Sequence, residues 1–165
     1  MRSHLALLLV GVLLISAAGG DEKKPAPGLT IRSYALREVK EKGPDGKEQT
    51  KYVQIKEQKS GDEVSFLIQY RNETKEPISE GQIVYQVPPG AVFMDAWGEG
   101  AMALVSIDKG EHWARHPATI KVKGKDGKVV EKPLPLDRIT HVRWIIQQPV
   151  KPGAEGQVGL KVKIK

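Results

Sequence analysis

Cysteine is absent from the 165 residues, and its absence excludes several kinds of protein at once. Without cysteine the chain forms no disulfide, offers no thiolate to a metal ion and has no cysteine nucleophile. A fold built from this sequence therefore depends on its apolar core alone. In an exported protein, the lack of disulfides favours a bacterial cell envelope over an animal secretory pathway.

Long apolar runs are also scarce, because the sequence holds a single one, at its N-terminus. Arg2 precedes an apolar stretch at residues 5–15, and small residues follow at positions 16–18. These three parts are typical of a secretory signal peptide. The stretch is shorter than the about 20 apolar residues that span a bilayer. We therefore expect residues 1–20 to be a signal peptide and the mature chain to be exported without a transmembrane segment; an uncleaved N-terminal anchor is the alternative.

Acidic residues are outnumbered by basic ones. The chain has 26 Lys and Arg against 20 Asp and Glu, a net charge of +6, and loss of residues 1–20 would remove Arg2 alone and leave +5. Such an excess permits loose attraction to anionic polymers such as teichoic acid, lipopolysaccharide or nucleic acid. The lysines are spread along the chain and often alternate with apolar residues, as on the wet face of a sheet. Solubility is the simpler interpretation, and we expect no specific nucleic-acid partner.

The remaining chain has the pattern of one β-domain behind a short linker. Residues 21–28, DEKKPAPG, are charged and proline-bearing and have no apolar face, which predicts a flexible linker. From residue 29 to residue 165 the dominant period is two. Apolar residues alternate with polar ones in EVSFLIQYR (63–71), GQIVYQV (81–87), THVRWIIQ (140–147) and GQVGLKVKIK (156–165). Four such runs predict an antiparallel sheet with one face on a core.

Turn signals divide the domain into short strands. Asp-Gly pairs at residues 45–46 and 126–127 lie between β-capable flanks and predict hairpins. Two segments compete as helices: IRSYALREVKEK (31–42), and AWGEGAMAL (96–104), which Gly98 and Gly100 interrupt. About seven to nine strands in one domain are most economically buried as two packed sheets. The predicted fold is all-β, an immunoglobulin-like antiparallel β-sandwich over residues 29–165.

Several spaced motifs from about Lys59 to the end occur in a familiar order. A strand opened by a Gly-Asp turn ends in asparagine, a Pro-Gly turn follows, a Ser-x-Asp-x-Gly hairpin precedes an aromatic residue, and an Arg-Trp strand precedes a last Pro-Gly turn. The positions are Asn72, Pro89, Gly90, Ser106, Asp108, Gly110, Trp113, Arg143, Trp144, Pro152 and Gly153. This order resembles the conserved repeat domain of unknown function from bacterial cell-surface proteins.

The resemblance implies an immunoglobulin-like β-sandwich without known catalytic residues. The chain departs from the family because it carries one copy behind a predicted signal peptide, with an apparent insertion around KVKGKDGKVVEK (121–132). A single copy does not make a spacer array. A small exported accessory or interaction protein fits better than a stalk.

The segment EHWARH (111–116) is the best candidate for a metal site. Two histidines four residues apart on a helix are a zinc-binding arrangement. Here DKG precedes the segment and Pro117 follows it, so a helix is unfavourable and a hairpin exit is expected. In an extended segment, His112 and His116 still share a face and could meet His141 from another strand. We predict no metal or other cofactor and keep these three histidines as the only candidate ligands.

Other chemistry has less support. The carboxylates Asp95, Glu99, Asp108 and Glu111 have no spacing that places a pair across a cleft. No serine lies in a Gly-x-Ser-x-Gly turn. We therefore expect no enzyme.

Binding is the function that the sequence favours. Trp97 lies beside glycines in DAWGEG, so we expect it in a loop and partly exposed, where its ring could stack on a sugar with nearby lysines. The first expectation is an exported, non-enzymatic interaction or structural module of the bacterial cell envelope, periplasmic or extracellular, with an envelope protein as partner. The alternatives are a polysaccharide-binding module that uses Trp97 and a histidine-based metal-binding protein.

Overall fold

The computed structural model describes residues 28–43, 46–125 and 127–165. The predicted signal peptide and all but the last residue of the predicted linker lie outside the described residues. No helix within these ranges is both long and apolar enough to cross a membrane. The elements are β1 (Leu29–Lys42), β2 (Glu48–Gln54), β3 (Glu63–Asn72), β4 (Gln82–Gln86), β5 (Ala91–Gly98), β6 (Ala101–Ser106), β7 (Ala114–Arg115), β8 (Thr119–Lys123), β9 (Val129–Pro133), the short 3-10 helix η1 (Leu136–Arg138), β10 (His141–Ile146) and β11 (Glu155–Ile164).

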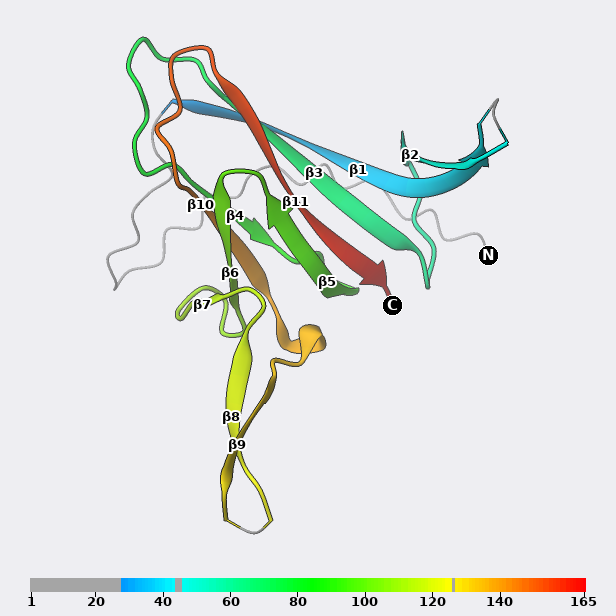
Figure 1. Ribbon diagram of the computed structural model, residues 1–165, viewed down its shortest axis with the longest axis vertical. Coiled ribbons are helices and arrows are strands. Elements are labelled where there is room, and N and C mark those ends of the chain that lie inside the picture. The colour runs from blue at the N-terminus through cyan, green and yellow to red at the C-terminus, as the bar shows by residue number, and fades with distance from the viewer. Residues whose placement is uncertain (1–27, 44–45, 126) are drawn as a thin grey trace, which may run out of the picture.

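The strands form two packed antiparallel sheets and one separate hairpin (Figure 1). The first sheet has the order β2-β1-β3-β11-β5, the second has the order β4-β10-β6-β7, and β8 pairs with β9. The predicted all-β antiparallel sandwich is confirmed. The immunoglobulin-like topology is not confirmed. Here β3 lies between β1 and the last strand, β11. In constant-type immunoglobulin domains the strand in the corresponding place, the second, lies between the first and the fifth strands.

Alternating side chains of both sheets fill the space between them. Each fully buried aliphatic side chain contributes about 2 kcal/mol by leaving water. Trp144 of β10 is fully buried at the centre of the second sheet, and Phe93 of β5 at the edge of the first. The other buried apolar residues of β3, β10 and β11 are Val64, Phe66, Ile68, Tyr70, Val142, Ile146, Val158, Leu160 and Val162. The four alternating runs of the sequence therefore supply most of the core.

Strand β1 covers the segment that competes as a helix in the sequence. It pairs with β3 from Leu29 to Leu36 and with β2 from Leu36 to Lys42. Its inward side chains Leu29, Ile31 and Ala35 pack against the core. Composition alone did not decide this segment, because long-range pairing with β3 determines its conformation.

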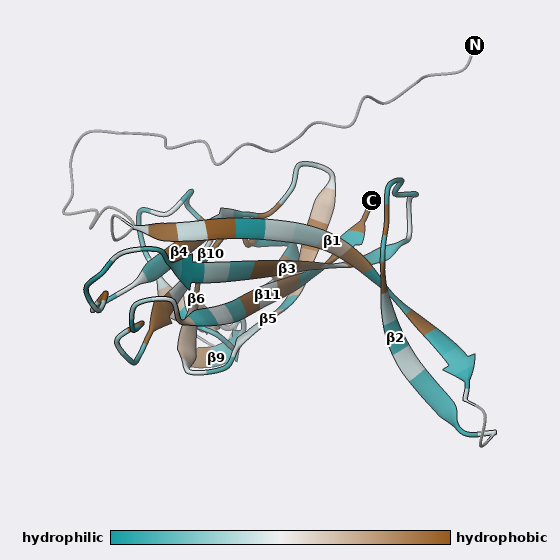
Figure 2. Ribbon diagram, turned by 90° about the horizontal axis from the view of Figure 1, so that it is seen from above, coloured by the Kyte–Doolittle hydropathy of each residue, from teal (hydrophilic) through white to brown (hydrophobic). Residues whose placement is uncertain are grey.

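Two hairpins extend beyond the sandwich. Seen from above, the hairpin of β1 and β2 extends past the ends of β3 and β11 (Figure 2). The hairpin of β8 and β9 points away from both sheets (Figure 1). The described residues form 11 strands, whereas the sequence predicts about seven to nine.

Asn72, the last residue of β3, ties together two connections between the sheets. Its side chain is fully buried. The Nδ2 group donates to the carbonyls of Glu76 and Val150, each at 2.8 Å. The Oδ1 atom accepts from the backbone N–H of Thr74 at 2.8 Å and from its hydroxyl at 2.6 Å. All four hydrogen-bonding positions of the amide are used, so the β3–β4 and β10–β11 connections are held to one another at one end of the sandwich.

We predict that Asn72→Ala lowers the free energy of unfolding by about 3 kcal/mol, because it removes one hydrogen bond from each of two carbonyls and leaves the Thr74 N–H without its acceptor. Asn72→Asp places a carboxylate against the same carbonyls, which raises the pKa of that carboxyl above its unfolded value. The variant therefore regains stability as the pH falls through that raised pKa. Urea unfolding at several pH values checks both variants. Gln69→Ala, at an exposed position of the same strand, is the control and should change the stability by less than about 0.5 kcal/mol.

Candidate functional site

The Ser-x-Asp-x-Gly segment after β6 forms a hydrogen-bonded turn. The buried Ser106 hydroxyl donates to Asp108 Oδ1 at 2.6 Å and accepts from the Gly110 N–H at 2.9 Å. The Thr140 hydroxyl accepts from the Lys109 N–H at 3.1 Å. Lys109 and Gly110 have φ values of 61° and 96°, a left-handed pair that reverses the chain. The turn is thereby anchored to the segment that enters β10.

His112 lies on the exposed side of this turn. Its backbone N–H donates to Asp108 Oδ1 at 3.0 Å, and its Nδ1 lies 2.7 Å from Asp108 Oδ2. The Ser106 hydroxyl, the His112 N–H and the His112 ring hold the pKa of the Asp108 carboxyl well below its usual range. The Asp108 carboxylate therefore keeps its negative charge at acidic pH.

His116 lies at the edge between the two sheets. Its Nε2 is 2.9 Å from Asp95 Oδ1, and its ring meets the Phe93 ring edge to face, with centroids 5.2 Å apart. Its side chain is only 15% exposed. The histidine closes the apolar core beside β5 and meets a carboxylate at its outer nitrogen.

His141 begins β10, where it pairs with Ser106 of β6. Its Nδ1 lies 3.0 Å from the Thr140 hydroxyl. The three candidate histidines thus contact three different residues, Asp108, Asp95 and Thr140. Across the described ranges, the one set of three metal-binding side chains that comes together is Asp108, Glu111 and His112, whose ligand atoms lie within 4.8 Å of one another. Only His112 of the predicted trio belongs to it. The hydrogen bonds of the turn account for the closeness of Asp108 and His112.

Trp113 covers the outer face of the second sheet. The guanidinium carbon of Arg143 lies 4.0 Å from the centroid of its ring, within reach of a cation–π interaction. A Cβ at Gly110 would lie 3.3 Å from the same ring. The turn motif and the Arg-Trp strand, 30 residues apart, therefore meet in one packed unit whose contacts are structural.

Trp97 belongs to strand β5, so the expected loop is wrong, although the expected partial exposure is confirmed at 38%. It pairs with Gly159 of β11, where an added Cβ would lie 2.4 Å from Trp97 Cζ2. Gly98 is the last residue of the strand, and a Cβ there would lie 2.8 Å from Val158 Cγ1, so close packing requires glycine at this position. The ring therefore covers the Gly159 backbone on the outer face of the first sheet.

Two depressions of the surface lie elsewhere. One of about 590 Å³ lies between the start of β4 and the end of β10, beside Ser79, Gln82 and Gln147. A second of about 280 Å³ lies over Arg32, Arg71 and Glu155 on the first sheet. Neither is lined by the candidate histidines or by Trp97. Arg71 is itself paired with Glu155 at 3.1 Å and with Glu73 at 3.4 Å.

The two projecting hairpins expose apolar side chains to solvent. Every residue of β2 and β9 is exposed. Tyr52 and Val53 on β2 are 58% and 41% exposed, and Val129 and Val130 on β9 are 64% and 43% exposed. The sequence signalled both hairpins through their Asp-Gly turns but gave no sign that they leave the sandwich. Comparison with protein-family models, curated proteins and solved structures finds no match.

We predict that Gly159→Ala lowers the free energy of unfolding by about 2 kcal/mol, because the new Cβ collides with Trp97. In the Trp97→Ala background the same change should cost about 1 kcal/mol less, since the colliding ring is gone. Urea unfolding of the parent, both single variants and the double variant measures this coupling. An equal cost of Gly159→Ala in both backgrounds would show that the ring does not cover the glycine.

Proposed function

We propose that the chain is an exported, non-enzymatic interaction module of the bacterial cell envelope that pairs with a partner strand along β2. The signal-like N-terminus and the resemblance to a domain of surface proteins support the location. The observation that carries the mode of binding is the free edge of β2. Among the described residues this strand pairs with β1 alone and ends the first sheet.

The hydrogen-bond pattern shows which residues face the free edge. At the two ends of the hairpin, the Gly43 N–H donates to the Lys47 carbonyl at 2.8 Å and the Ile55 N–H to the Ala35 carbonyl at 3.0 Å. The register between these points has no irregularity. Because bonded residues alternate in an antiparallel pair, the odd-numbered residues of β2 bond to β1 and the even-numbered ones face outward. The residues whose backbone N–H and C=O groups face the free edge are Glu48, Thr50, Tyr52 and Gln54.

Charge does not block this edge. Lysines on edge strands commonly prevent pairing with other chains. Lys51 of β2 instead donates to Glu41 of β1 at 2.6 Å, so its ammonium group is neutralised within the hairpin. Tyr52 and Val53 offer an exposed apolar contact on each face of the strand. A partner strand would gain backbone hydrogen bonds at the edge and side-chain contacts on both faces.

We predict that a photo-crosslinking phenylalanine analogue at Tyr52 captures one discrete envelope protein in the native cell. Thr50→Pro should remove the adduct, because it deletes an outward N–H without touching the bonds to β1. Thr50→Ala keeps the N–H and should keep the adduct. The same analogue at Leu136, exposed on η1, controls for random contact.

Thermal unfolding of the Thr50→Pro protein shows whether its fold is intact. An adduct that persists in the folded proline variant, or equal labelling from positions 52 and 136, would contradict strand pairing at β2.

A further inference from the structure

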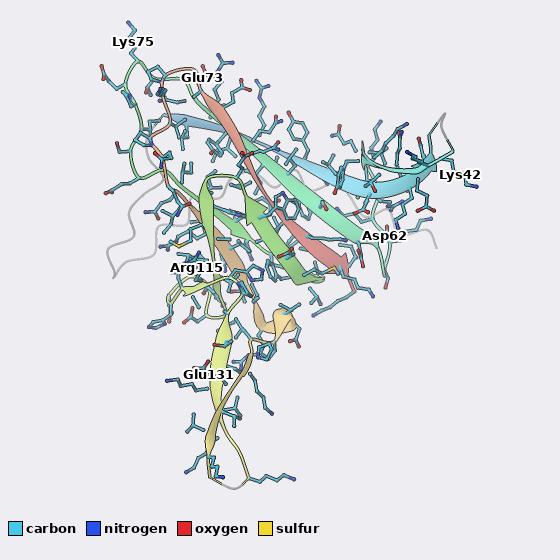
Figure 3. The ribbon with its side chains drawn as sticks, in the orientation of Figure 1. Lys42, Asp62, Glu73, Lys75, Arg115 and Glu131 are labelled. Atoms are coloured by element: carbon cyan, nitrogen blue, oxygen red, sulfur yellow. The ribbon has the colours of Figure 1, made fainter. Side chains whose placement is uncertain are left out.

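The hairpin of β8 and β9 carries a large share of the positive charge of the chain. Residues 119–133 contain five lysines against Asp126 and Glu131, a net charge of +3 out of +6 for the whole chain. The hairpin points into solvent away from both sheets, and Glu131 lies midway along it (Figure 3). The other lysines that the structure describes lie on the sandwich, on its loops or on the β1–β2 hairpin.

The hairpin lysines differ in their surroundings from two lysines of other strands. Lys51 of β2 is paired with Glu41 and Lys161 of β11 with Glu63, each at 2.6 Å. Within the described part of the chain, four hairpin lysines have no ion pair or hydrogen bond of their ammonium groups: Lys121, Lys123, Lys125 and Lys132. Lys121 lies opposite Glu131 in the register without reaching it. These charges are therefore uncompensated.

Strand geometry spaces the charges along the hairpin. Lys121 and Lys123 share one face of β8, about 7 Å apart. Lys132 lies opposite Ile120 on the other face, and Lys125 lies near the tip. A single small anion would meet one exposed lysine, an interaction worth at most about 1 kcal/mol. A chain of anions meets several lysines at once and releases its counterions.

We propose that the β8–β9 hairpin binds a linear anionic polymer that runs along its lysines. Exposed Val129 and Val130 lie between these lysines and contact the uncharged links of the polymer. A membrane surface fits less well, because insertion needs apolar residues at the leading end, and the described tip residues are Gly124, Lys125, Gly127 and Lys128. This inference concerns a different hairpin from the strand pairing at β2, so either proposal can fail alone.

The test measures binding of the full chain to two labelled polymers, inorganic polyphosphate and polygalacturonate, by fluorescence anisotropy. We expect binding that weakens with salt. Changing Lys121, Lys123, Lys125 and Lys132 to glutamine should raise Kd by about tenfold or more and reduce the slope of log Kd against log salt by about 3. Changing the same four lysines to arginine should retain binding. Binding of both polymers would show that the hairpin recognises negative charge without regard to the anionic group. Binding of polyphosphate alone would identify phosphate as the preferred group, and binding of polygalacturonate alone would identify carboxylate.

A matched control changes four exposed lysines of other segments, Lys40, Lys56, Lys75 and Lys151, to glutamine. It removes the same total charge and should raise Kd by less than about threefold. Thermal unfolding verifies that each variant is folded. An equal loss in the control variant would overturn the proposal, because binding would then follow net charge. Absence of binding to both polymers at about 0.15 M salt, or binding only to anionic lipid vesicles, would overturn it as well.

Discussion

The side-chain amide of Asn72 fixes how the two sheets are joined at one end of the sandwich. The β3–β4 and β10–β11 connections both cross between the sheets there, and the amide bonds to a carbonyl of each, Glu76 and Val150. Backbone bonds continue the junction, because the Asn72 N–H donates to Ala154, the Gly153 N–H donates to Asn72, and Ile78 bridges Val150. In a chain without cysteine, this buried polar junction adds a directional constraint on the relative position of the two sheets to the packing of their apolar side chains.

The residues that suggest catalysis, metal binding or ligand binding in the sequence have structural roles in the sandwich. Ser106, Asp108 and His112 make a turn, His116 closes the core beside Phe93, and Trp113 stacks on Arg143. Trp97 covers a glycine. Among the described residues, four of the seven large exposed apolar side chains lie instead on two hairpins outside the sandwich. An isolated two-stranded hairpin is only marginally stable in water. Binding of the proposed partners would stabilise the two hairpins.

The sequence predicts the core strands well, because alternation in β3, β10 and β11 is a local signal that the sandwich uses directly. It does not decide β1, whose conformation depends on pairing with β3. The sequence predicts a loop at Trp97 because Gly98 is a loop signal, whereas in the structure Gly98 is needed for close packing against Val158. The sequence does not predict contacts between residues far apart along the chain: Val150 is 78 residues from Asn72, and Asp95 is 21 residues from His116. The insertion at residues 121–132 was visible, but its projection from the fold depends on tertiary structure.

Hydrogen exchange resolved by residue tests most directly the division between a stable sandwich and hairpins ordered by partners. Amides of residues 119–133 should exchange by local opening and much faster than those of β3 and β11, which open only with global unfolding. Added polyphosphate should slow exchange in the hairpin and leave β3 and β11 unchanged. Hairpin amides as protected as those of β3 in the free chain, or protection by polyphosphate confined to the sandwich, would contradict this account.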